Sequence, residues 1–185
     1  MSSYVHYLNI LLGLGAIVMQ IASMAVIALL VVSIKQKTES RVLDLVSKHF
    51  LMIGFVVAFS ATAFSFIYSN ILNFPPCSLC WYARVFMFPQ MFIFGVALYM
   101  KDRKVIAYSF PLVVVGLLIS IYHNFGYYFG GSSSLPCDAS GVSCYQRLVS
   151  EFGGYISIPM LSLTSVVALF TVLLVAHFYK RQEIN

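Results

Sequence analysis

The sequence predicts an all-α integral membrane protein, folded as a bundle of helices. The chain has 185 residues, of which 61% are hydrophobic and only 9% are charged, and its mean hydropathy is +0.91. A soluble domain carries about a quarter charged residues, so this chain has too few polar side chains to cover a surface in water. Lipid is therefore expected to be the solvent for most of its surface.

Five apolar runs are each long enough to cross the hydrocarbon core of a bilayer, which needs about 20 helical residues. They cover residues 4–34, 50–72, 81–100, 105–129 and 158–179. Open strands cannot satisfy their backbone groups in lipid and the runs lack the alternation of a barrel, so each run is expected to be a helix. The first run has too long an apolar core for a signal peptide and no basic segment before it, so we expect it to be retained.

The basic residues mark alternate connections between these runs. Most of the 11 lysines and arginines follow the first, third and fifth runs. They are Lys35, Lys37, Arg41 and Lys48, then Lys101, Arg103 and Lys104, then Lys180 and Arg181. The positive-inside rule then predicts an N-terminus outside, a C-terminus in the cytoplasm, and outer connections at residues 73–80 and 130–157. Topology accounts for the net charge of +5, and no nucleic-acid surface is expected.

The first outer connection ends in NFPPCSLCWYAR, residues 73–84. The two prolines preset the backbone for the start of a helix. Cys77 and Cys80 are then expected in its first turn, where unpaired amides and the helix dipole stabilise a thiolate. Arg84 follows one turn deeper on the same face, about 6 Å along the axis.

The second outer connection, residues 130–157, holds the other two cysteines, Cys137 and Cys144. It opens with GGSSS, which is flexible linker chemistry. Residues 145–152 carry apolar side chains at helical spacing and are expected to be either a short interfacial helix or an ordinary loop.

All four cysteines therefore fall on the predicted outer side, and three interpretations of them compete. A structural staple is one, although C-x-x-C closes too small a loop to constrain much chain. Zinc is another, although the C-x6-C spacing of the second pair differs from the usual short knuckle. Thiol redox chemistry is the third and the one we favour, while a c-type haem is excluded because Trp81 stands where that motif needs histidine.

Arg84 is an ionisable residue inside an apolar run and has two interpretations. It is either an anchor that snorkels to the interface or a fixed cation for an anion at the site. Such an anion is the Cys80 thiolate or a reduced oxygen on a small redox ligand. Because a guanidinium keeps its proton, Arg84 would act there as an electrostatic stabiliser and not as an acid.

The stretch CSLCWYAR, residues 77–84, resembles the C-x-L-C-x-x-x-R signature of the disulfide bond formation protein B (DsbB) family. His123, within IYHN, resembles a histidine at a similar place in that family, and residues 153–159, GGYISIP, resemble the segment before its last helix. The resemblance covers about residues 50–179. It implies a four-helix membrane core at residues 49–185 with the outer loop 130–157, preceded at residues 1–48 by an extra transmembrane helix and a cytoplasmic loop.

The resemblance also implies a function, that of a thiol:quinone oxidoreductase in the bacterial inner (cell) membrane. Such a protein oxidises a thioredoxin-fold (DsbA-like) dithiol partner and passes the electrons to a membrane quinone of the ubiquinone or menaquinone type. By position, Cys77 and Cys80 are the pair near the quinone, Cys137 and Cys144 are the pair that meets the partner, and Arg84 helps to hold the quinone. His123 is either a packing residue or a quinone contact and proton donor.

Three departures from the family accompany this resemblance. The chain has an extra first helix, Ala83 replaces a polar residue often found before the motif arginine, and the loop cysteines are closely spaced. Two other functions stay open: a non-catalytic, disulfide-stapled membrane scaffold, and a quinone reductase like vitamin K epoxide reductase. The second family places its loop pair before the C-x-x-C, and the order here is reversed.

Overall fold

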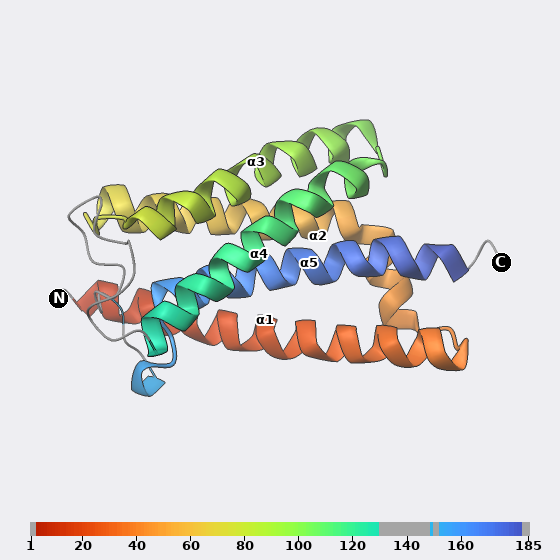
Figure 1. Cartoon of the computed structure of the whole chain (residues 1–185), viewed down its shortest axis with the longest axis horizontal. Helices are drawn as coiled ribbons and strands as arrows, with labels where there is room; N and C mark the ends of the chain where they lie inside the picture. Colours follow the sequence, from red (N-terminus) through yellow and green to blue (C-terminus); the bar gives the residue numbers. More distant parts are fainter. Residues whose placement is uncertain (1–2, 130–148, 150–151, 183–185) are drawn as a thin grey trace.

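The computed structural model describes residues 3–129, 149 and 152–182, and its long elements are all helices (Figure 1). In chain order they are α1 (Ser3–Gln36), α2 (Arg41–Phe66), a π-helical turn η1 (Ile67–Ile71), α3 (Ser78–Met100), α4 (Val105–Phe129), a 3-10 turn η3 (Phe152–Gly154) and α5 (Ile158–Gln182). Within the described residues, 5 helices are long and apolar enough to cross a membrane. The predicted all-α membrane bundle is confirmed.

Helix α5 is the centre of the bundle. It packs against α1, α2 and α4, whereas α3 packs mainly against α2 and α4. Small residues, among them Thr164, Ala168 and Thr171, are buried along α5, and small side chains allow helices to approach closely in a membrane protein. Half of the apolar span of α5 is buried, a larger share than in any other described helix.

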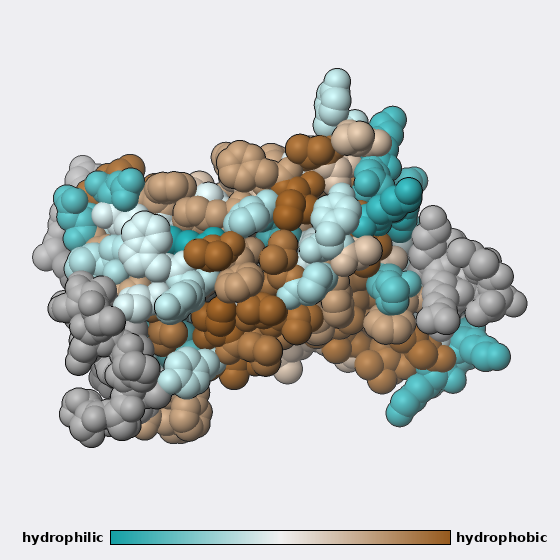
Figure 2. Space-filling view, turned by 45° about the horizontal axis from the view of Figure 1, so that its top comes forward, coloured by the Kyte–Doolittle hydropathy of each residue, from teal (hydrophilic) through white to brown (hydrophobic). Residues whose placement is uncertain are grey.

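The two ends of the bundle differ in chemistry. The α1–α2 and α3–α4 connections lie at one end, which we call the basic end, together with Lys37, Lys101 and Lys104. Cys77 and the start of α3 lie at the opposite end, the cysteine end (Figure 1). On the face that Figure 2 shows, apolar residues cover the middle of the molecule and hydrophilic residues gather toward its ends, most of all at the basic end.

Helix α2 begins nine residues before the apolar run that predicted it, at Arg41 rather than at position 50. The added turns bury Leu43 in a cluster with Leu30 and Val175. The Tyr179 hydroxyl also donates a hydrogen bond to the Ser40 carbonyl, 3.3 Å away. Packing against α1 and α5 therefore extends the helix beyond its lipid-crossing part.

Substitution of Gly54 on α2 is expected to destabilise the bundle. A Cβ atom at this position would overlap the ring of Phe94 on α3, and Phe94 is fully buried. Overpacking of this kind costs about 1–3 kcal/mol, so Gly54→Ala should lower the thermal midpoint of the protein in detergent. Gly15→Ala is the matched control, because nothing lies within 4 Å of a Cβ atom there. An equal midpoint for the two variants would contradict the prediction.

Candidate functional site

The cysteine pair sits at the first turn of α3. Cys77 is the N-cap residue, with an extended backbone (φ −71°, ψ 170°), and its Sγ accepts a hydrogen bond from the backbone N–H of Cys80. That N···S distance is 3.3 Å, and the two Sγ atoms are 2.9 Å apart without a disulfide between them. The C-x-x-C spacing thus closes a helix cap and brings both sulfurs together.

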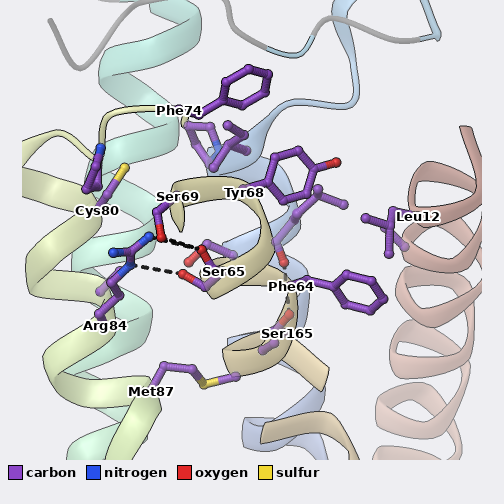
Figure 3. Close-up of a pocket in the computed structure, with 18 of the residues that line it drawn as sticks. Leu12, Phe64, Ser65, Tyr68, Ser69, Phe74, Cys80, Arg84, Met87 and Ser165 are labelled. Atoms are coloured by element: carbon purple, nitrogen blue, oxygen red, sulfur yellow. Dashed lines mark hydrogen bonds between the residues drawn. The ribbon is translucent and has the colours of Figure 1, made fainter. Parts of the chain in front are cut away.

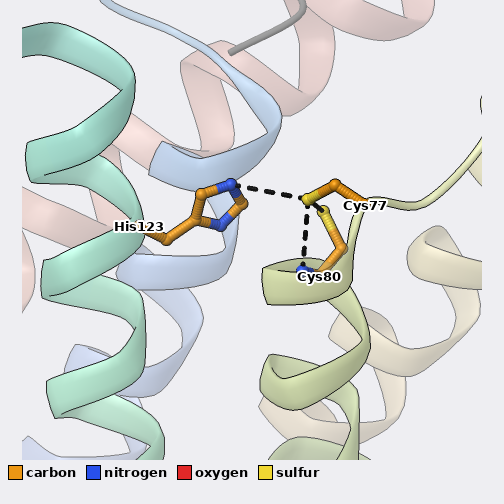
Figure 4. A group of neighbouring side chains, drawn as sticks. All are labelled: Cys77, Cys80 and His123. Atoms are coloured by element: carbon orange, nitrogen blue, oxygen red, sulfur yellow. Dashed lines mark hydrogen bonds between the residues drawn. The ribbon is translucent and has the colours of Figure 1, made fainter. Parts of the chain in front are cut away.

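His123 reaches the same sulfurs from α4 (Figure 4). Its Nε2 atom lies 3.8 Å from Cys77 Sγ, and the ring is buried, with 3% of its surface exposed. The three ligand atoms of Cys77, Cys80 and His123 lie within 4.8 Å of one another. This is a donor set for a soft metal, but no fourth His, Cys, Asp or Glu joins it within the described part of the chain.

The surroundings of Cys77 favour its neutral thiol form. A side-chain hydrogen bond with Cys80 and the burial of the side chain raise its pKa from 9.0 to about 12, and His123 opposes this only in part. Of the two cysteines in the first turn, Cys77 is therefore the less favourable place for a thiolate. Burial and the neighbouring sulfur outweigh the helix start, which stabilises negative charge by a smaller amount.

Arg84 lies one turn below Cys80 and points into the bundle (Figure 3). Its Nε donates to Ser65 Oγ at 2.9 Å and a terminal nitrogen donates to the Ser65 carbonyl at 3.2 Å. The guanidinium carbon is 5.1 Å from the centre of the Trp81 ring and 5.8 Å from that of Phe88. These contacts hold the side chain against α2 and between the Trp81 and Phe88 rings.

Among the described residues, no acidic side chain neutralises the charge of Arg84. The charged groups that act on it are Cys80 and Cys77, and the described acids, Glu39, Asp44 and Asp102, lie toward the basic end. Ser65 uses two of the five N–H donors of the guanidinium. A half-buried cation held in this way is suited to stabilise an anion at the same place.

These groups face one cavity of about 390 Å³ between α1, α2, α3 and α5. Cys77, Cys80, Arg84 and His123 all line it. Other lining residues come from the end of α2 and from η1, including Ser65, Tyr68 and Ser69, and from α1, namely Leu11, Leu12, Gly15, Ala16 and Met19. The remaining lining is mostly apolar, with Phe64, Phe74, Met87 and Phe88 among its members.

Comparison with known proteins places this architecture in a family. A model of the family described as "Disulfide bond formation protein DsbB" matches residues 47–176. The chain belongs to the DsbB family. It is a multi-pass membrane protein of this disulfide-forming family, as the resemblance of residues 77–84 predicted, and it spans the bilayer with the helices described above.

Several curated relatives carry names from disulfide formation. The chain is 38% identical over 141 residues to "Probable disulfide formation protein C 2" of Bacillus anthracis, which covers 76% of this chain and 99% of that relative. It is 37% identical over 118 residues to "Disulfide bond formation protein C" of Bacillus subtilis, covering 64% of this chain and 85% of the relative. It is also 31% identical over 138 residues to "Probable disulfide formation protein" of Coxiella burnetii, covering 74% and 93%. No solved structure matches the chain significantly.

Helix α1 lies outside the DsbB match. The family model begins at residue 47, after α1 ends at Gln36. The Bacillus anthracis relative is aligned over 99% of its length with only 76% of this chain. The relative is therefore aligned over nearly its whole length, while about a quarter of this chain stays outside the alignment.

Sequence reasoning missed several residues of the DsbB-type site. Ser65, Tyr68 and Ser69 enter the cavity at the junction of α2 with η1. Serines at positions 60, 65 and 69 recur at four- to five-residue spacing in an apolar run, which was the available signal for a polar helix face. The predicted loop pair, Cys137 and Cys144, and most of the predicted short helix at 145–152 lie outside the described residues.

Proposed function

We propose that this DsbB-family protein is a membrane thiol:quinone oxidoreductase. It oxidises a thioredoxin-fold, DsbA-like dithiol partner and delivers the electrons to a membrane quinone of the ubiquinone or menaquinone type. The observation that carries the proposal is the shared cavity, which exposes the cysteine pair, the Arg84 guanidinium and a histidine to one ligand-sized space.

The residues present fit a quinone. The cavity of about 390 Å³ is lined mainly by apolar side chains, as suits a flat lipid-soluble ring. Arg84 and the serine hydroxyls of Ser65 and Ser69 supply polar groups beside it. A bound quinone supplies a two-electron, two-proton acceptor, and the Cys77–Cys80 dithiol gives up both electrons and both protons as its S–S bond forms.

Within the pair, negative charge falls on Cys80. Cys77 keeps its proton because its pKa is raised to about 12, whereas Cys80 lies in the first turn of α3, one turn above Arg84. The guanidinium and the helix start both favour an anion at this position. The role of Arg84 is thus to stabilise charge at Cys80 and on the ligand.

His123 is the acceptor for the proton of Cys77. Its Nε2 is 3.8 Å from the thiol sulfur, and no other His, Cys, Asp or Glu of the described residues joins the three-residue cluster. Disulfide formation requires Cys77 to lose its proton, and a neighbouring imidazole is suited by its geometry to take it.

The second cysteine pair completes the relay. Cys137 and Cys144 lie in the connection between α4 and α5 and exchange disulfides with the soluble partner. Thiolate attack on the Cys77–Cys80 disulfide then transfers oxidation to the loop pair through a mixed disulfide. Each exchange breaks one S–S bond and forms another, so one electron pair passes from the partner dithiol through the two cysteine pairs to the quinone.

Reconstitution tests the proposal. The purified protein is placed in liposomes with a quinone and a reduced thioredoxin-fold dithiol protein, and the quinone absorbance is followed together with the thiols of the partner. We expect one quinone to be reduced for each partner disulfide formed. If the quinone is not reduced and the partner is not oxidised, the result would instead support a disulfide-stapled scaffold. Cys80→Ser serves as the inactive control.

The cysteine end is proposed to face the outside of the cell, with the C-terminus in the cytoplasm. The basic end carries Lys37, Lys101 and Lys104, and basic residues are retained on the cytoplasmic side. We expect a membrane-impermeant maleimide to label the reduced cysteines in intact cells. The control is a Ser40→Cys variant in a cysteine-free background, since Ser40 lies in the α1–α2 connection. Labelling of Ser40→Cys but not of the native cysteines would reverse the orientation.

A further inference from the structure

Helix α1, which the family match does not include, forms one side of the cavity. Its lining residues are Leu11, Leu12, Gly15, Ala16 and Met19, which recur at helical spacing and so share one face. Figure 3 shows Leu12 on α1 across the cavity from Cys80 and Arg84. The space at the redox site is thus closed on one side by an element that lies outside the family match.

The cavity changes character from one side to the other. The α3 side presents the sulfur of Cys80 and the guanidinium of Arg84, and α2 adds the Ser65 hydroxyl. The α1 side presents hydrocarbon and the thioether of Met19. Leu11 lines the cavity and is also 66% exposed, so the apolar side reaches the lipid-facing surface beside α1.

Hydrogen bonds hold α1 in register on both sides of its lining segment. Before this segment, the Tyr68 hydroxyl donates to Asn9 Oδ1 at 2.5 Å, and Asn9 is 1% exposed. After it, Gln20 donates to Thr164 Oγ1 at 2.8 Å and accepts from the Tyr155 hydroxyl at 2.8 Å. Residues 11–19 are therefore fixed against α2 and α5 and are not a loose membrane anchor.

We propose that α1 forms the binding site for the prenyl tail of the quinone and makes the protein selective for tailed over tail-less quinones. This inference rests on the proposed function. A prenylated quinone has a polar ring and an apolar chain. The ring matches the α3 side of the cavity, and the chain matches the α1 side. The opening beside Leu11 lets a tail longer than the cavity continue into the bilayer.

Gly15 is the position at which to test this. A Cβ atom there meets nothing within 4 Å, and Gly15 lines the cavity, so a larger side chain at this position takes up cavity space. Gly15→Phe fills the apolar side, and Gly15→Ala is a milder step in the same direction. Val18→Phe is the matched control, because Val18 is 66% exposed on the same helix and does not line the cavity.

The first readout is binding, measured without turnover. The chain has a single tryptophan, Trp81, whose ring stacks 5.1 Å from the Arg84 guanidinium. Its fluorescence therefore reports on a ligand at the redox end of the cavity. The probes are a prenylated benzoquinone and the same ring with a methyl group in place of the tail, each titrated into the full-length protein in detergent.

For Gly15→Phe we expect the dissociation constant of the prenylated quinone to rise about tenfold or more, since several buried CH₂ groups lose their site. Binding of the tail-less ring should change by less than about twofold, and KM values should follow the same pattern. Leu12→Ala removes a lining contact without adding bulk, so it should weaken binding of the prenylated probe and not of the tail-less one. This variant keeps the test valid if Gly15→Phe fails to fold.

The outcomes separate the two proposals. If the wild-type protein binds both probes and the Gly15→Phe and Leu12→Ala variants bind them as the wild type does, the tail site is wrong while the quinone function stands. An equal loss of affinity for the two probes in these variants would also overturn the tail site. If neither probe quenches Trp81 and neither is reduced by the wild-type protein, the quinone function itself fails.

Discussion

Replacing Arg84 by alanine is expected to slow quinone reduction about 100-fold, because one preorganised charge contact typically contributes that much to a transition state. The guanidinium is already held by Ser65 at 2.9 Å and has no acidic partner among the described residues. Its charge is therefore available to Cys80 and to the ligand without reorganisation. Steady-state rates against quinone concentration, in liposomes with an excess of partner, measure the effect.

Two controls distinguish this role from packing. Arg84→Lys should recover only part of the rate, because an ammonium group cannot reproduce the planar fork that bonds Ser65. Disulfide exchange between the cysteine pairs and the partner should continue in Arg84→Ala, since the soluble partner meets the loop pair and Arg84 acts at Cys80 and the quinone. A folded Arg84→Ala protein with normal quinone kinetics would leave Arg84 as a packing residue stacked on Trp81 and Phe88.

Removing the loop cysteines is expected to abolish oxidation of the partner altogether. In a Cys137→Ser, Cys144→Ser protein, the Cys77–Cys80 pair should still be reoxidised by added quinone, because it lines the cavity with Arg84 and His123. Partner thiols are followed by alkylation and gel shift. The state of the Cys77–Cys80 pair is followed in the same samples by mass spectrometry.

Ser143→Ala is the matched control for the loop, since it changes the neighbour of Cys144 without removing a sulfur. It should turn over the partner normally. Normal turnover by the double cysteine variant would mean that the partner reacts directly with Cys77–Cys80, and the two-pair relay would be wrong. Cys80→Ser should eliminate turnover in either case.

Much of the fold followed from the sequence because lipid imposes strong rules on it. A run of about 20 apolar residues has few alternatives to a helix, and all five predicted helices are confirmed. The start of α3 was also readable, since Pro75 and Pro76 followed by Cys77 form a local signal that depends on no distant contact. The DsbB resemblance, carried by eight consecutive residues, is confirmed by the family match.

The features that the sequence did not reveal depend on packing between helices. The lipid-facing and cavity-facing sides of α1 are equally apolar, so residues such as Leu12 and Gly15 carried no signal of their place in the site. The raised pKa of Cys77 likewise depends on its hydrogen bond with Cys80 and on burial in the folded bundle, and its neighbour His123 is 46 positions away along the chain. The early start of α2 at Arg41 needed its partners on α1 and α5.

The π turn at Ile67–Ile71 makes the lining of this cavity sensitive to chain length. Such a turn holds one residue more than the α-helix around it, and each residue of an α-helix advances by about 100°. Deletion of one residue at the start of this turn would restore regular α-helix. The residues that follow the deletion, Ser69 included, would then rotate by about that angle relative to the cavity. Insertion or deletion at this turn is thus an evolutionary route to a different ligand surface with every lining side chain unchanged in identity.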